Sequence, residues 1–84
     1  MASITTETMA LAAFTLPGSP HSARMARFYV RTSLAYYGLA HYADDAETVA
    51  SELISNAVTH APAPVVTLGL TWMEGSRALG IVVT

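Results

Sequence analysis

The chain of 84 residues has no cysteine and no lysine, and only 12% of its residues are charged. Without cysteine it forms no disulfide, no thiolate metal site and no cysteine nucleophile. Four arginines and six acidic residues leave a formal net charge of −2, which argues against a nucleic-acid-binding protein that works through positive charge. The hydrophobic fraction of 52% is too high for an intrinsically disordered chain.

No apolar run approaches the roughly 18 residues that a membrane-spanning helix requires. Residues 9–16 are apolar enough to resemble the core of a signal peptide, but no basic residue precedes them and a Pro-Gly-Ser-Pro turn follows. We therefore expect a cytoplasmic protein that binds neither membranes nor nucleic acid directly. The length allows at most one small domain, over residues 1–84.

Hydrophobic periodicity and turn residues predict three strands and two helices. The expected strands cover residues 10–16, 65–72 and 78–84, and the expected helices cover residues 20–37 and 43–61. Ser19 followed by Pro20 is a typical helix start, in which a hydroxyl caps the helix and proline takes its first position. Gly38 is expected to end the first helix in the left-handed conformation, and Pro62 to stop the second.

This order of elements predicts an α+β fold, in which two helices pack on one face of a small, mainly antiparallel sheet. Three strands are few for such a sheet, and the strand over residues 78–84 would be an exposed edge. Both points suggest that the sheet is incomplete and that further chain follows Thr84.

Three arginines, Arg24, Arg27 and Arg31, lie along one flank of the first predicted helix. They can be solvated charges whose aliphatic stems cover apolar surface. They can also be the contact with an acidic partner. The sequence leaves both interpretations open.

The second predicted helix has a broad apolar arc and a line of polar residues at its border. At 100° per residue the arc, which should face the core, contains Ala46, Val49, Ala50, Leu53, Ile54, Ala57, Val58 and Ala61. Four hydroxyl residues should face water on the opposite side: Thr48, Ser51, Ser55 and Thr59. Glu52, Asn56 and His60 are spaced four residues apart, so they stack along one side of the helix at the edge of the arc.

A carboxylate, an amide and an imidazole in one line suit a polar ligand that lies beside the helix. The amide oxygen of Asn56 suits Mg²⁺ that keeps most of its waters and binds phosphates. Glu52, one turn away, could take a proton from a hydroxyl or water that attacks a phosphoryl group. His60 could reach phosphate when protonated, or donate one hydrogen bond when neutral. The same spacing also serves many helix surfaces only as local stabilisation.

The segment Ser-Glu-Leu-Ile-Ser-Asn-Ala-Val-Thr-His-Ala over residues 51–61 closely resembles the N-box of the GHKL ATPases, the superfamily of histidine kinases, gyrase and Hsp90. It is most similar to the branch of bacterial anti-sigma-factor serine/threonine kinases and their ATP-binding regulatory relatives. Residues 23–39 resemble the first helix of that branch, and the resemblance extends over about residues 10–84. It implies a Bergerat-type ATP-binding fold, with the nucleotide between the N-box helix and a mobile lid.

The resemblance implies a role for each matching residue. Asn56 would coordinate the Mg²⁺ that bridges the ATP phosphates, and Glu52 would serve as general base. Ala57 would line the nucleotide pocket, and His60 would lie near the phosphates. In the kinase members, a serine of an anti-sigma antagonist receives the γ-phosphate, and the same kinase sequesters a sigma factor. A sigma factor and such an antagonist are therefore the implied partners, and we also consider a homodimer.

The family also needs an Asp-x-Gly-x-Gly box, whose Asp binds the adenine amino group, and a glycine-rich lid. Neither is present in residues 1–84. The chain therefore resembles the N-terminal part of a GHKL domain, and with half of the pocket its affinity for ATP should be poor. Whether it is an enzyme stays open. The alternatives are a non-catalytic interaction module, which binds through the arginines and the sheet edge, and an inactive remnant of such a domain.

Overall fold

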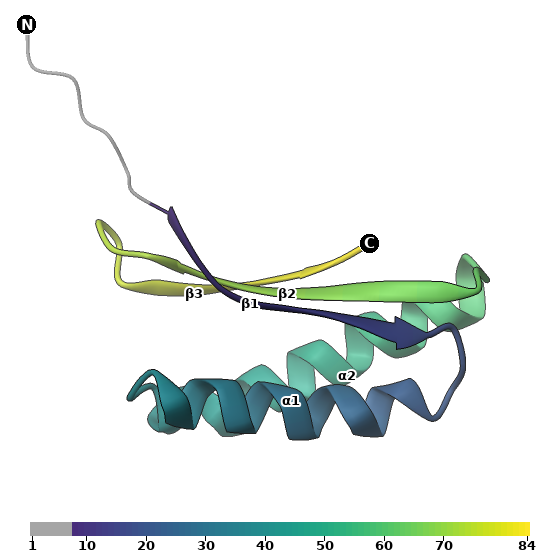
Figure 1. Cartoon of the computed structure of the whole chain (residues 1–84), viewed down its shortest axis with the longest axis horizontal. Helices are drawn as coiled ribbons and strands as arrows, with labels where there is room; N and C mark the ends of the chain where they lie inside the picture. The colour runs from purple at the N-terminus through teal and green to yellow at the C-terminus, as the bar shows by residue number, and fades with distance from the viewer. Residues whose placement is uncertain (1–7) are drawn as a thin grey trace, which may run out of the picture.

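The structure, a computed structural model, describes residues 8–84, which form two long helices and three strands in the predicted order. The elements are β1 (Thr8–Pro17), α1 (Ser22–Tyr36), the short 3₁₀ helix η1 (Ala40–Tyr42), α2 (Ala43–His60), β2 (Val65–Met73) and β3 (Ala78–Val83). Figure 1 shows both helices on one face of the sheet, and the predicted α+β class is confirmed. The apolar residues 9–16 lie in β1, and within residues 8–84 no helix is long and apolar enough to cross a membrane.

The sheet is antiparallel throughout, and its strand order is β1-β2-β3. Leu68 in the central strand pairs with Phe14 of β1 and with Val83 of β3. A bulge interrupts the β1 pairing between Ala10 and Ala12. β3 is therefore an edge strand, as predicted, and β1 forms the opposite edge.

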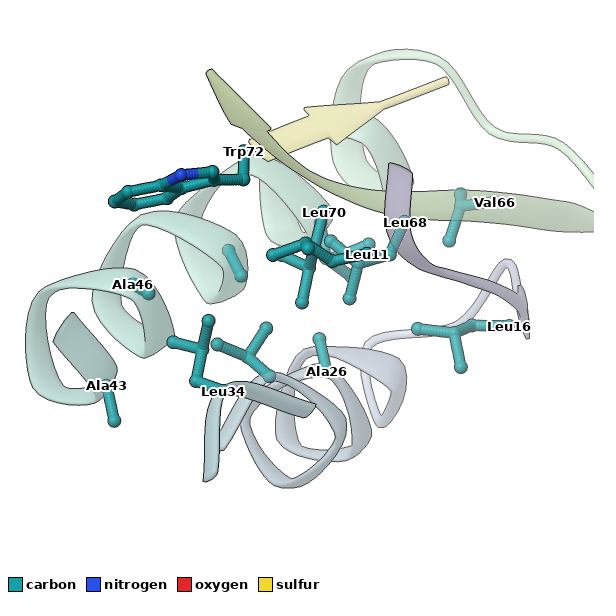
Figure 2. Close-up of a cluster of buried hydrophobic side chains, with 13 residues drawn as sticks. Leu11, Leu16, Ala26, Leu34, Ala43, Ala46, Val66, Leu68, Leu70 and Trp72 are labelled. Carbon is teal, nitrogen blue, oxygen red and sulfur yellow. The ribbon is translucent and has the colours of Figure 1, made fainter. Parts of the chain in front are cut away.

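The core lies between the sheet and the two helices, and each element contributes to it with its own periodicity. Every second residue of β2 is buried, and α1 is buried at helical spacing. The buried apolar residues of these two elements are Val66, Leu68, Leu70, Trp72, Ala26, Val30 and Leu34. Figure 2 shows Leu70 of the sheet and Leu34 of α1 turned into the same cluster. The core therefore uses only the helix-facing side of the sheet.

The start of α1 differs from the prediction. The helix begins at Ser22, two residues later than expected, and its N-cap residue is His21, which makes no side-chain capping bond. The expectation that Ser19 caps the helix is wrong. Residues 18–21 instead form the turn out of β1, and the buried Ser22 hydroxyl donates a hydrogen bond back to the carbonyl of Pro17. The turn is thus tied to the strand that precedes it.

Two glycines occupy positions that a side chain would disturb. Gly38 has φ of +74°, and the amide of Leu39 donates to the carbonyl of Leu34 at 2.7 Å, so the predicted left-handed end of α1 is confirmed. At Gly18 an added Cβ would lie 1.8 Å from the carbonyl oxygen of Ala63. The turn after β1 and the loop before β2 can approach this closely only because Gly18 has no side chain.

The buried stripe of α2 is narrower than the predicted arc. Its fully buried residues are Ala43, Ala46, Ala50 and Ile54. Val49, which was expected to face the core, is 44% exposed, and Ala61 is exposed and lies beyond the last helical residue. The reason is that Val49 faces β3 across an open groove at the edge of the sheet, so the described strands cover it only in part.

Candidate functional site

An ion-pair cluster joins α2 to α1 along the flank of α2 that faces the other helix. Arg31 Nη2 lies 2.7 Å from Asp44 Oδ1 and also contacts Glu47, and Arg27 Nε lies 3.8 Å from Glu47 Oε1. Arg27 also donates a hydrogen bond of 2.9 Å to Ser51 Oγ. For these two arginines the acidic groups in contact belong to the chain's own second helix. Ser51, which was expected to face water, is half-buried and faces α1.

Glu47 is the most buried member of this cluster. Its side chain is 13% exposed, whereas that of Asp44 is 93% exposed. Glu47 Oε2 is buried without an aligned hydrogen bond, and its partner is the guanidinium of Arg31. The hydrogen bond to Asp44 and then the close contact with the Glu47 carboxylate raise the pKa of Arg31, so this guanidinium stays charged. Arg24 is exposed and takes no part in the ion pairs found within residues 8–84.

Glu52, Asn56 and His60 lie on the side of α2 turned away from α1, and all three are exposed. Successive members are about 6 Å apart along the helix axis. No side-chain hydrogen bond or ion pair within the described residues engages them. Ala57 is half-buried and packs against the core. The predicted polar line is therefore a free surface feature of α2, with Ala57 beneath it.

A groove of about 320 Å³ lies between α2 and β3, on the same flank of the helix. Its lining residues are Tyr42, Asp45, Ala46 and Val49 from the helix side, and Leu79 and Ile81 from β3. Asp45 precedes Glu52 by seven residues, and Val49 precedes Asn56 by the same interval. Seven residues return a helix to within about 20° of the same direction. Glu52 and Asn56 are not among the lining residues; they lie on the same flank as Asp45 and Val49, further toward the end of α2.

The sequence interpretation missed this groove. It placed Val49 in the buried arc, although the spacing of seven residues from Val49 to Asn56 was a signal that both share one flank. The second wall had no such signal. Leu79 and Ile81 reach the groove because of the β2–β3 pairing, which sequence periodicity alone does not place against a particular flank of α2.

The donor set on α2 fits Mg²⁺ only in combination with a ligand. Within residues 8–84 no three His, Asp or Glu side chains gather as a metal cage would require. Asn56 offers one exposed amide oxygen, and the Glu52 carboxylate lies one turn away. Mg²⁺ in nucleotide sites keeps several waters and takes phosphate oxygens beside one or two side chains, so this set fits a magnesium nucleotide. The groove is at the small end of ligand pockets and would enclose only part of one.

Comparisons with known proteins give no relative for this chain. No family model, no curated protein and no solved structure matches it. The resemblance to the N-box therefore depends on residues 51–61 and on where α2 places them.

Proposed function

We propose that this chain carries the N-box side of a Mg²⁺–ATP site and works as an ATP-binding regulatory protein similar to the anti-sigma-factor serine/threonine kinases. The observation that carries the proposal is the exposed line of Glu52, Asn56 and His60, on the flank of α2 that also carries the groove-lining Val49. The proposal implies a sigma factor as bound partner and a serine-bearing antagonist as phosphoryl acceptor. It also implies a cytoplasmic location, where these partners and ATP occur together.

Each residue on this flank has a distinct part in the proposal. ATP with Mg²⁺, when bound, supplies a phosphoryl group whose negative charge the metal offsets. Asn56 would hold the metal through its amide oxygen, and Ala57 would leave room beside the helix because its side chain is small. Glu52 would accept the proton of the attacking hydroxyl, and His60 would donate a hydrogen bond to a phosphate oxygen.

The course of β3 shows where the proposal requires its second motif. Thr84 pairs with Thr67, close to the start of β2 and therefore near the end of α2. Figure 1 shows β3 and α2 running in the same direction, so chain that follows Thr84 would enter on the Asn56 side of the site. An Asp-x-Gly-x-Gly box would have to lie there. The reading frame downstream of codon 84 should encode that box, and a stop codon without it would count heavily against the proposal.

The direct test is a titration of the ¹⁵N-labelled chain with ATP, with and without Mg²⁺. The amide chemical shifts of the chain are the readout. We expect weak, saturable, Mg²⁺-dependent shifts at residues 45–60, because a partial pocket buries little of the ligand. Asn56→Ala should abolish the Mg²⁺-dependent shifts. Glu52→Ala should leave them intact, since its role is to accept a proton and not to bind. Ser55→Ala is the matched control, because Ser55 is exposed beside the line but not on it.

Two outcomes of this titration would contradict the proposal. One is the absence of any saturable shift in the unaltered chain. The other is Mg²⁺-dependent binding that Asn56→Ala and Ser55→Ala support equally, because the amide would then have no part in holding the metal.

A second candidate function, a non-catalytic interaction module, is favoured by the exposed apolar surface. Phe28 is 67% exposed and Tyr36 is 81% exposed, and within residues 8–84 neither β1 nor β3 pairs with a further strand. Such a module would bind its partner equally well with and without MgATP. A chain that neither binds nor melts cooperatively would be an inactive remnant.

A further inference from the structure

The edge of the sheet at β1 is protected against strand pairing only at the bulge and at the end of the strand. β1 contains no charged residue over its ten residues, and Pro17 stands only at its end. Natural edge strands usually carry charges, prolines or bulges that block the pairing of a further strand. Here the bulge lies at Leu11, and the hydroxyl of Tyr37 donates to the Leu11 carbonyl at 2.8 Å. The edge is thus closed at Leu11, and among residues 8–84 no strand pairs with its outer side over residues 12–16.

A second groove, of about 330 Å³, lies between this edge and α1. Leu11, Ala12 and Phe14 line it from β1, and Tyr29, Thr32 and Tyr36 line it from α1. The ring of Phe14 stacks on that of Tyr29 with 4.6 Å between the ring centroids. The floor is therefore rigid and aromatic, and none of the lining residues carries a charge.

Two of the three arginines of α1 point away from this groove. Arg27 and Arg31 point toward α2, where their acidic partners lie. Thr32 and Tyr36, four residues apart and both exposed, line the groove from α1; Phe28 and Arg24 continue this spacing toward the start of the helix and are not among the lining residues. The part of α1 that lines the groove, over residues 29–36, is therefore uncharged and partly aromatic.

We infer that this groove binds an extended, uncharged peptide segment of a partner protein, which adds a fourth strand beside β1. The peptide backbone pairs with the open edge over residues 12–16. Alternate apolar side chains of the peptide enter the groove against Phe14, Tyr29 and Tyr36. Main-chain hydrogen bonds supply affinity in strand addition, and the pocket for alternate side chains supplies specificity. A charged side chain is excluded, because it would lose water in the groove without meeting an opposite charge.

A second copy of the chain fits this groove poorly through its own β1. In a β1–β1 pair, the helix-facing side chains of the second strand would have to enter the groove of the first. Those side chains are already engaged, since Leu16 is 2% exposed and Phe14 is stacked on Tyr29. The groove needs a strand whose inward side chains are free, as they are in a loop or a flexible tail.

The experiment uses the 84-residue chain and a panel of blocked seven-residue peptides, in which threonine alternates with valine and the central residue is Phe, Leu, Ile or Trp. Binding is followed by amide chemical shifts of the ¹⁵N-labelled chain. We expect saturable shifts at residues 12–16 and 29–36 for at least one peptide. The same peptide with N-methyl groups on its edge-facing amides should lose at least about tenfold in affinity, because it can no longer pair with β1.

Thr32→Arg is the test variant, because it puts a charge on the exposed wall of the groove, and Tyr36→Ser removes an aromatic from the same wall. Thr59→Arg makes the same change on the exposed surface of α2 and is the control. We expect Thr32→Arg to weaken peptide binding at least about tenfold and Thr59→Arg to leave it unchanged. All variants are first shown to melt as the unaltered chain does.

Four results would overturn the inference. The first is that no peptide binds at millimolar concentration, and the second is that Thr32→Arg binds the peptide as tightly as the unaltered chain does. The third is that peptide-induced shifts are confined to the β3 edge. The fourth is that the unaltered chain forms a dimer that Thr32→Arg dissociates. The last result would assign the groove to a second copy. The affinity for the peptide should be the same with and without MgATP. A failure of the peptide inference can therefore be told apart from a failure of the nucleotide proposal.

Discussion

Two substitutions on α2 test whether burial in the folded protein, and not membership of the predicted apolar arc, determines the cost of removing a side chain. Ile54 and Val49 both fall on the predicted apolar arc, but Ile54 is fully buried and Val49 is 44% exposed. Ile54→Ala removes three carbon atoms from the core, which costs about 2.4 kcal/mol in transfer free energy, and a cavity that does not collapse adds up to about 2 kcal/mol. We therefore expect a loss of about 2 to 4 kcal/mol in the free energy of unfolding.

Val49→Ala should behave differently. It removes two methyl groups that are only half-buried, which costs about 0.8 kcal/mol, and alanine returns about half of this through its higher helix propensity. The net change should be within about 0.5 kcal/mol of zero. A chain of this length is stable by roughly 4 to 13 kcal/mol, so the loss at Ile54 is a large share of the total. That loss should lower the Tm by roughly 10 to 25 °C, whereas Val49→Ala should hardly change the Tm.

The assay is urea unfolding followed by the fluorescence of Trp72, the single tryptophan, which is 9% exposed and packs edge-on against Tyr42. The slope of the free energy with urea should not change between variants, since both unfold the same surface. Equal losses for the two substitutions, or a loss above about 1.5 kcal/mol for Val49→Ala, would refute the packing described for this flank.

Two further predictions concern local structure. Glu47→Ala should cost about 1 to 2 kcal/mol, because it removes a largely buried carboxylate that two arginines contact, whereas Asp44→Ala should give no resolvable change in Tm, since Asp44 is 93% exposed. A larger effect for Asp44→Ala would contradict the role of Glu47 as the centre of the cluster. Gly38→Ala should cost about 1 kcal/mol through its positive φ alone, because nothing lies within 4 Å of an added Cβ. Gly38→Asn should cost less in the same thermal melt, since asparagine tolerates that conformation, and equal costs would point to a different cause.

Much of the candidate site could be predicted from the sequence, because it lies on one helix. The spacing of Glu52, Asn56 and His60 fixes their relative directions once the segment is helical. What the spacing left open was the direction in which that line points. The pairing of α2 with α1 through Glu47, Arg27 and Arg31 turns the line away from α1 and leaves it exposed.

The sequence by itself determined the elements of this protein, because helices and strands arise from contacts between residues two to four positions apart. The strands, the helices and the left-handed Gly38 were all readable for that reason. Only the tertiary structure decided that Val49 is exposed, that α2 is the acidic partner of α1, and that β1 is an open edge beside an aromatic groove. These features join residues far apart in the chain, and they depend on how many strands cover each flank, which no local spacing encodes.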